Sequence, residues 1–124
     1  MMSDNTILIL EDEALIAMDL GEELADRGWT VCDIVGTVEA AEQASQINAP
    51  DLAILDVNLR GQYSFDLARA MLARGTTVIF LSGNTAQNLP EDLRDCTFLR
   101  KPVSYDALHK TLLAAAAGRP TVKA

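Results

Sequence analysis

Polar residues of types that perform chemistry follow directly after several short apolar runs of the sequence. They are Glu11, Asp12, Asp56, Ser82 and Lys101. Three carboxylates placed together repel one another unless a cation neutralises them. Magnesium prefers oxygen ligands and keeps part of its water, so it suits one or two carboxylates with a carbonyl and a phosphoryl oxygen. We therefore expect magnesium-dependent phosphoryl transfer, in which positioning and charge neutralisation do most of the catalysis.

The nucleophile of such a reaction is expected to be Asp56. A carboxylate can form an acyl-phosphate intermediate, and Asp56 follows the run that would form the central strand. Ser82 is a poorer nucleophile, because the only histidine, His109, lies well inside a predicted helix and is not near it. The Ser82 hydroxyl is instead expected to contact a phosphoryl oxygen, and the Lys101 ammonium to pair with the phosphoryl charge.

The elements that must position these residues alternate along the chain. Strands are predicted where short apolar runs lack polar alternation, which is typical of strands buried on both faces. They cover residues 6–10, 29–35, 52–55, 78–81 and 97–99. In a parallel sheet covered by helices, ligands bind beyond the carboxyl ends of the strands. The polar residues named above all lie at such ends, so this fold would bring them together.

Helices are predicted between the strands, where apolar residues are spaced three or four apart. Strong patterns lie within residues 16–28, 40–48, 64–75 and 105–118. Gly28 and Gly75 are suitable C-terminal ends, and Ser64 is an expected N-cap. Another helix, within residues 84–95, is expected to be short and weak because Pro90 and many polar residues interrupt it. The alternation predicts an α/β fold, a doubly wound parallel sheet of five strands with five helices.

Length and charge limit the remaining possibilities. The chain of 124 residues has the usual size of one domain, and we expect a single domain over residues 1–124 that ends in a polar tail, residues 118–124. A formal net charge of -8 would repel a phosphate backbone, so nucleic acid is not an expected partner. Apolar runs fall far short of the roughly 20 residues that span a bilayer, and residues 1–5 lack a basic secretion signal. We expect a cytoplasmic protein without membrane association.

The polar residues, in this order and at these strand ends, resemble the receiver domains of two-component response regulators, including single-domain chemotaxis regulators. The resemblance extends from Thr6 to about Gly118. Residues 56–61, 70–75 and 82–83 are also similar to a group of single-domain regulators from alphaproteobacteria. The resemblance implies a flavodoxin-like receiver fold with strand order 2-1-3-4-5.

The resemblance also implies a role for each acidic residue. Asp56 would be the phosphoacceptor and a metal ligand. Asp12 would bind Mg²⁺ directly, and Glu11 partly through water. Asn58 occupies the position that offers the metal a backbone carbonyl. The implied ligand set is therefore three carboxylates and one carbonyl.

A second set of implied roles concerns the switch. Ser82 would follow the phosphoryl group on activation, and Lys101 would contact it. Phe98 stands at the position of the switch aromatic, where tyrosine is more usual. The Lys101–Pro102 peptide bond is expected to be cis, which would aim the ammonium at the phosphoryl site. The segment 83–95 is expected to move, because its helix has the fewest apolar anchors.

The function that follows is a single-domain response regulator. It would accept a phosphoryl group on Asp56 from a histidine kinase or histidine phosphotransfer protein. It would then signal to a downstream protein by conformational change, or pass the phosphoryl group on. It would have no separate turnover substrate and would not be an enzyme in that sense.

Three alternatives compete with this interpretation. A phosphatase of the haloacid dehalogenase-like class also uses a strand-end Asp, a hydroxyl residue, a Lys and Mg²⁺. That class places a second Asp two residues after the nucleophile, where this chain has Asn58, and its metal-binding acids come late in the chain. A pseudo-receiver would need none of the polar residues. The third alternative is a fragment of a hybrid kinase, although the chain begins and ends like a complete small protein.

Overall fold

The computed structural model describes residues 6–83 and 89–117, so the predicted tail at 118–124 lies outside the described residues. One sheet holds the five long strands: β1 (Thr6–Leu10), β2 (Thr30–Val35), β3 (Leu52–Asp56), β6 (Thr77–Ser82) and β7 (Thr97–Arg100). Their order is β2-β1-β3-β6-β7, and every neighbouring pair is parallel. This confirms the predicted order, with β6 and β7 as its fourth and fifth strands.

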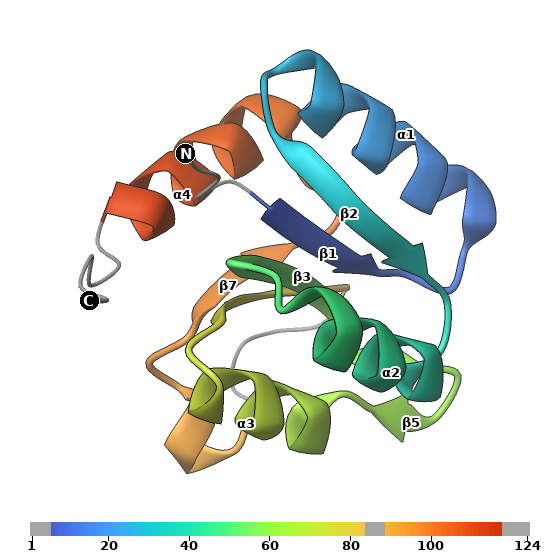
Figure 1. The fold of residues 1–124 in the computed structure, drawn as a ribbon, viewed down its shortest axis with the longest axis vertical. Coiled ribbons are helices and arrows are strands. Elements are labelled where there is room, and N and C mark those ends of the chain that lie inside the picture. Colours follow the sequence, from blue (N-terminus) through green and yellow to red (C-terminus); the bar gives the residue numbers. More distant parts are fainter. Residues whose placement is uncertain (1–5, 84–88, 118–124) are drawn as a thin grey trace.

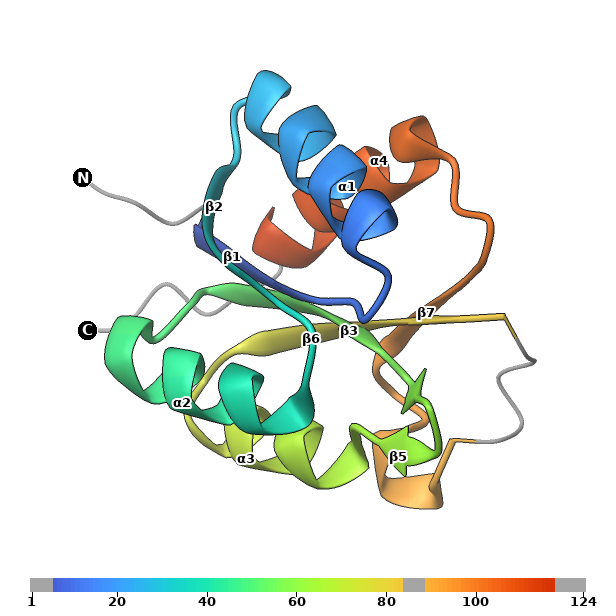
Figure 2. The same ribbon diagram turned by 90° about the vertical axis from the view of Figure 1, so that its right-hand side faces the viewer.

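Helices cover both faces of the sheet, as Figures 1 and 2 show. They are α1 (Ala14–Asp26), α2 (Val38–Asn48), α3 (Phe65–Ala73) and α4 (Tyr105–Ala117). Helices α1 and α4 lie on one face, and α2 and α3 lie on the other. The doubly wound α/β class is therefore confirmed. In the described part of the chain, no helix has the length and apolarity needed to cross a membrane.

The continuous apolar runs are explained by these two helical layers. Successive side chains of a strand point to opposite faces, so a strand covered on both sides needs apolar residues throughout. In β1, Ile7 and Ile9 pack with α1 and α4, whereas Leu8 and Leu10 pack with α2 and α3. All four side chains are buried. The strand ends are thereby held in fixed positions relative to one another.

The predicted fourth helix is the part of the fold that needs correction. Residues 84–88 lie outside the described residues, and beyond them the structure has a single 3-10 turn, η2 (Glu91–Leu93). The described residues thus contain four α-helices and this turn in place of five helices. Pro90 lacks the N–H that a continuing helix requires, and within the described residues 89–95 the buried apolar side chains are Leu89 and Leu93. The weakness of this segment was predicted, and the part of it that the structure describes, from Leu89 onward, forms a 3-10 turn in place of an α-helix.

A short hairpin directly after β3 was not predicted. Strand β4 (Asn58–Leu59) pairs antiparallel with β5 (Gln62–Tyr63). Arg60 and Gly61 form the turn between them with positive φ angles of 58° and 94°, as in a type I′ turn. The Asn58 side chain supports the turn by accepting the Gly61 N–H at 2.7 Å. The hairpin places Arg60 close to the end of β1.

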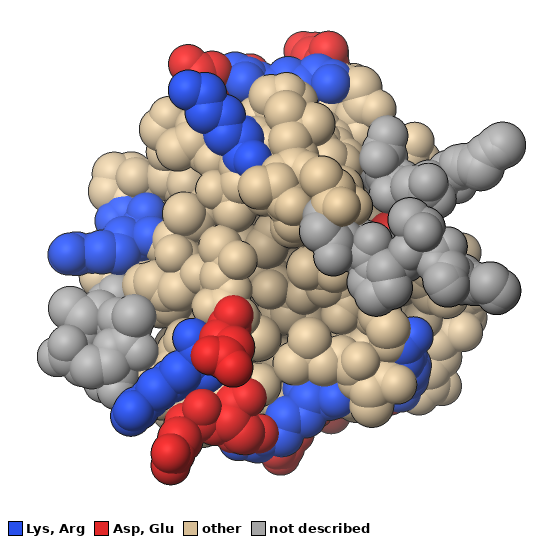
Figure 3. Space-filling model, turned by 90° about the vertical axis from the view of Figure 1, so that its left-hand side faces the viewer, with Lys and Arg blue, Asp and Glu red and all other residues tan. Residues whose placement is uncertain are grey.

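Charged side chains are distributed unevenly over the surface. The face on the left-hand side of Figure 1, where β1 begins, is uncharged over its centre and carries its charged side chains at the periphery (Figure 3). The acidic residues predicted to do chemistry lie at the opposite ends of the strands. The two ends of the sheet are therefore chemically different.

Candidate functional site

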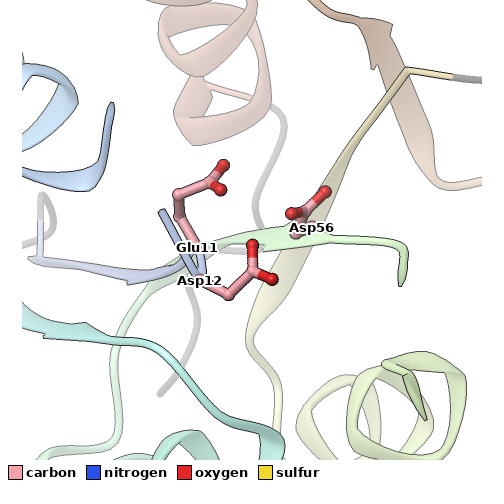
Figure 4. A group of neighbouring side chains, drawn as sticks. All are labelled: Glu11, Asp12 and Asp56. Carbon is pink, nitrogen blue, oxygen red and sulfur yellow. The ribbon is translucent and has the colours of Figure 1, made fainter. Parts of the chain in front are cut away.

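Three carboxylates meet at the carboxyl ends of two neighbouring strands. Glu11 and Asp12 follow β1, and Asp56 is the last residue of β3, which pairs with β1. One oxygen from each carboxylate lies within 4.8 Å of the others, and Figure 4 shows the three side chains side by side. Glu11 is 3% exposed and Asp56 is 6% exposed, so water cannot fully solvate their charges. The predicted acidic group is present in the fold.

Lys101 supplies the nearest positive charge. Its Nζ lies 2.8 Å from Glu11 Oε1 and 3.1 Å from Asp56 Oδ2, which makes two charge-assisted hydrogen bonds. The Lys101–Pro102 peptide bond is cis, as predicted. The Lys101 backbone N–H donates to the Ser82 carbonyl at 2.8 Å, so the end of β7 is tied to the end of β6. The lysine is therefore positioned by its backbone as well as by its ion pairs.

The surroundings raise the pKa of Asp56 from 3.8 to about 6. Burial is the main cause, because it disfavours the charged form. The charge of Lys101 opposes the rise, whereas the charges of Glu11 and Asp12 add to it. A carboxylate with a raised pKa beside two other acids is a site that a cation would stabilise.

The pKa of Lys101 is also above its ordinary value. Burial alone would lower it, but the hydrogen bond that Lys101 donates to Glu11, together with the charge of Asp56 and the hydrogen bond donated to it, outweighs burial. Lys101 therefore stays charged at neutral pH. A fixed ammonium beside Asp56 is suited to pair with an incoming phosphoryl group.

The remaining predicted residues surround this centre. Ser82 is buried at the end of β6, and Phe98 of β7 is half-buried beside Phe80 in the neighbouring strand. Phe98 packs against the cluster that contains Leu89 and Leu93. Their switch roles stay predictions.

Asn58 is exposed in β4, next to the acidic group in the chain. Its side chain accepts the Gly61 N–H, as described above, and its backbone belongs to the hairpin. The amide side chain therefore has a structural task in the turn. Its backbone carbonyl as a metal ligand stays a prediction.

Two further residues at the site were missed by sequence reasoning. Arg60 Nε lies 3.2 Å from Asp12 Oδ2, an ion pair between the hairpin and the end of β1. Ser64 takes the N-cap position of α3 but makes no side-chain cap there; its hydroxyl donates to the Asp56 backbone carbonyl at 2.7 Å. The N-cap position predicted for Ser64 is therefore confirmed, although its side chain makes no capping hydrogen bond. Gly61 between two short runs was a weak signal of the hairpin, because the residue before it, Arg60, is not one that such turns favour.

The donor set at this corner suits magnesium. All three side chains offer carboxylate oxygens, which are the hard ligands that Mg²⁺ prefers. The Asp12 side chain is 18% exposed, so the group is open to solvent on its side. A cavity of about 320 Å³ lies between Asp12, Gly36 and the hairpin. An ion could therefore reach the carboxylates from the hairpin side.

Comparison with known proteins identifies the class. Residues 7–113 match the family model of the response regulator receiver domain, so the chain belongs to this family. Receiver domains are signalling components of two-component systems, and phosphorylation and Mg²⁺ binding at an acidic pocket are general properties of the family. Receiver domains interact with histidine kinases or phosphotransfer proteins. The predicted resemblance is confirmed.

Particular relatives refine this assignment. The transcriptional regulatory protein PdtaR of Mycobacterium tuberculosis is 33% identical over 106 residues, which cover 82% of this chain and 52% of PdtaR. The chain spans about half the length of the curated relatives it matches.

Two solved structures match this chain over nearly the full length of both proteins. The solution structure of SdrG from Sphingomonas melonis Fr1 is 40% identical with a TM-score of 0.78, and the match covers 94% of this chain and 99% of SdrG. The receiver domain of Erythrobacter litoralis PhyR is 25% identical with a TM-score of 0.83, covering 97% and 95% of the two chains. The likeness to alphaproteobacterial receivers agrees with the prediction.

Proposed function

We propose that this protein is a single-domain response regulator that is phosphorylated on Asp56 in a Mg²⁺-dependent reaction. The donor is a histidine kinase or a histidine phosphotransfer protein. The observation that carries the proposal is the buried Asp56 carboxylate at the end of the central strand, 3.1 Å from Lys101 Nζ and grouped with two further carboxylates. SdrG, almost all of which this chain matches, supports a regulator of one domain.

The reaction follows from this geometry. An oxygen of the Asp56 carboxylate attacks the phosphorus of a phosphohistidine. The phosphorus–nitrogen bond breaks, its electron pair stays on the imidazole nitrogen, and an acyl phosphate forms on Asp56. Lys101 holds its charge beside the transferred group, and Ser82 offers a hydroxyl to one phosphoryl oxygen. No separate substrate is turned over.

Magnesium would be held by Glu11, Asp12, Asp56 and the Asn58 carbonyl. When bound, it would neutralise the carboxylate and phosphoryl charges that otherwise repel each other. The chain itself contributes the fixed strand ends. Ser64 adds a bond to the Asp56 carbonyl and thereby restrains the backbone of the nucleophile.

A docking surface for the phosphodonor lies on α1. Leu15, Ile16 and Met18 are exposed in its first turns. Neighbouring apolar side chains exposed on one helix are typical of a surface that binds another protein. Ile16 also lines a cavity of about 370 Å³ that reaches Glu11 and Lys101. A protein bound on these side chains would hold its phosphohistidine near Asp56.

The output would pass through the segment that follows Ser82. Residues 84–88 of this segment are outside the described residues, and the part from Leu89 onward contains η2. Phe98 packs against the hydrophobic cluster to which Leu89 and Leu93 belong, so a movement of this segment would change the surroundings of that cluster. Phosphorylation would shift the segment toward the state in which Ser82 contacts the phosphoryl group. The cytoplasmic location stays a prediction.

The phosphatase alternative is less well supported by the site. It needs a carboxylic acid two residues after the nucleophile, and the Asn58 side chain at that place is bonded to the turn. Hydrolysis of p-nitrophenyl phosphate with repeated turnover would favour the phosphatase. A receiver would show no such turnover.

The direct test is phosphorylation by acetyl phosphate with Mg²⁺, followed by mass spectrometry. The wild-type chain is expected to gain one phosphoryl group, and Asp56→Asn none. Asp66→Asn is a matched control, because Asp66 is an exposed acid at the start of α3. An equal yield in wild type and Asp56→Asn would overturn the assignment.

A further inference from the structure

Arg60 contacts the acidic group from the turn of the β4–β5 hairpin. Its Nε lies 3.2 Å from Asp12 Oδ2, while its own side chain is 80% exposed. Lys101, in contrast, bonds Glu11 and Asp56. The three carboxylates are therefore divided between two cations, and Asp12 is the one paired with Arg60.

The backbone of Arg60 is unfavourable for an arginine. Its φ of 58° lies in the left-handed region, which is unfavourable for a residue with a Cβ. Asn or Gly is preferred at this place of a type I′ turn. A residue kept in a disfavoured conformation points to a function for its side chain. The ion pair with Asp12 is the contact that this conformation provides.

We propose that Arg60 competes with Mg²⁺ for the Asp12 carboxylate and thereby sets the magnesium affinity of the receiver. The inference rests on the proposed function, because it assumes that Asp12 is a metal ligand. Arg60 is a positioning residue in this scheme. It acts through Asp12 and takes no part in bond making.

The competition has two physical sources. A Mg²⁺ ion bound to Asp12 must replace the guanidinium at a carboxylate that Arg60 already contacts. A guanidinium held near a divalent cation also repels it, and this repulsion is screened by salt. The Arg60 side chain is exposed, so it can leave without opening the core. Its effect is therefore adjustable and moderate in size.

The test is a Mg²⁺ titration of the full chain by isothermal calorimetry. Arg60→Gln removes the charge but keeps a side chain in the strained turn, and it is expected to bind Mg²⁺ about three- to tenfold more tightly at low salt. The ratio of the two Mg²⁺ affinities should fall toward one at about 1 M salt. Arg60→Lys keeps the charge and should remain near wild type.

Two further variants separate charge from backbone strain. Arg60→Asn relieves the strain and removes the charge, so it should match Arg60→Gln. Arg74→Gln is the control, because Arg74 also pairs with a carboxylate, Glu42, but on the α2 and α3 side of the molecule. Its Mg²⁺ affinity should equal that of wild type.

A direct readout is the Nε–H resonance of Arg60 by NMR, assigned from its absence in Arg60→Gln. Its shift should change with Mg²⁺ and saturate together with the calorimetric signal. Equal affinity in wild type and Arg60→Gln, or weaker binding in Arg60→Gln, overturns the inference while the proposed function stands. If wild type and all variants fail to bind Mg²⁺, the proposed metal site fails and the inference fails with it.

Discussion

Two regions of the molecule border Ser82 and differ in how they are held. The acidic corner lies at the ends of β1 and β3, strands that are hydrogen-bonded on both sides and covered on both faces. The segment around η2 has no place in the sheet. It is held by two buried leucines, Leu89 and Leu93, and by an ion pair between Arg69 and Asp92.

In the acidic corner, Glu11, Asp12 and Asp56 are held in place by the sheet although their carboxylates repel one another. The described part of the segment around η2 has favourable side-chain contacts but few backbone hydrogen bonds to the rest of the fold. A phosphoryl group needs ligands that do not move, and a signal needs a part that does. Both demands are met next to each other, with the Ser82 carbonyl already bonded to the Lys101 N–H. The difference suggests that charge placed on the firm region is read out by the weakly held one.

The largest expected effect compares two leucines of equal burial. Leu55 in β3 and Leu93 in η2 are 0% and 1% exposed. Leu55→Ala should lower the free energy of unfolding by about 4–5 kcal/mol, because the sheet cannot collapse around the cavity. Leu93→Ala should cost only about 2 kcal/mol, because its segment can adjust. Urea unfolding measures both, and equal losses would contradict the difference between the regions.

Metal binding should depend on one region alone. Asp12→Asn is expected to weaken Mg²⁺ binding by on the order of 100-fold or more, since losing a ligand costs more than losing a supporting contact. Asp92→Asn removes the same charge from the segment around η2 and should leave the affinity unchanged. Calorimetric titration measures both. A similar loss in the two variants would mean that only net charge matters.

The charge strain at Asp56 should appear as a pH-dependent stability. Its pKa of about 6 in the folded protein exceeds the ordinary value of 3.8, so folding favours the protonated form. The stabilisation is complete below the unfolded pKa and is lost as the pH rises through about 6. Asp56→Asn should therefore be more stable than wild type at neutral pH by about 1–3 kcal/mol.

This gain should shrink as the pH falls through about 6 and disappear once it is well below 3.8, where Asp56 is protonated in both the folded and the unfolded wild type. Added Mg²⁺ should also reduce it, because the ion stabilises the carboxylate of wild type. Thermal or urea unfolding in a chelator, repeated across this pH range, measures the difference. A wild-type protein that is equally stable at neutral pH would show that Lys101 fully compensates the acids.

The smallest effect concerns the ion pair that ties η2 to α3. Arg69 bonds Asp92 through Nε at 2.7 Å and through a second nitrogen at 3.0 Å, but both side chains are exposed. Asp92→Asn should speed amide exchange of Leu93 and Cys96 by about two- to fivefold. Asp106→Asn is the control, because Asp106 lies on α4 and pairs with Arg27 at the end of α1. Unchanged exchange in Asp92→Asn would assign the segment's stability to its leucines alone.

Much of the fold and of the site was predictable, and the reason is local. A strand buried on both faces must be apolar throughout, as β1 and β3 are, so its end is visible where Glu11 and Asp56 begin. The cis bond before Pro102 and the terminal Gly28 and Gly75 were also predicted, and the two glycines have positive φ angles. The glycine positions depend on neighbouring residues, which the chain order preserves, whereas the cis bond was implied by the family resemblance.

The sequence by itself determined the strand order through family resemblance, and it determined which residues lie at the strand ends through their position after each apolar run. Only the tertiary structure decided which partner each polar group would take. The Ser64 hydroxyl donates a hydrogen bond to the Asp56 carbonyl and does not cap a helix N–H. Arg60 forms an ion pair with Asp12 from the turn of a hairpin that no strong sequence pattern marked. Such contacts join residues of different secondary-structure elements, and they depend on side-chain torsions and turn geometry that only the packed fold selects.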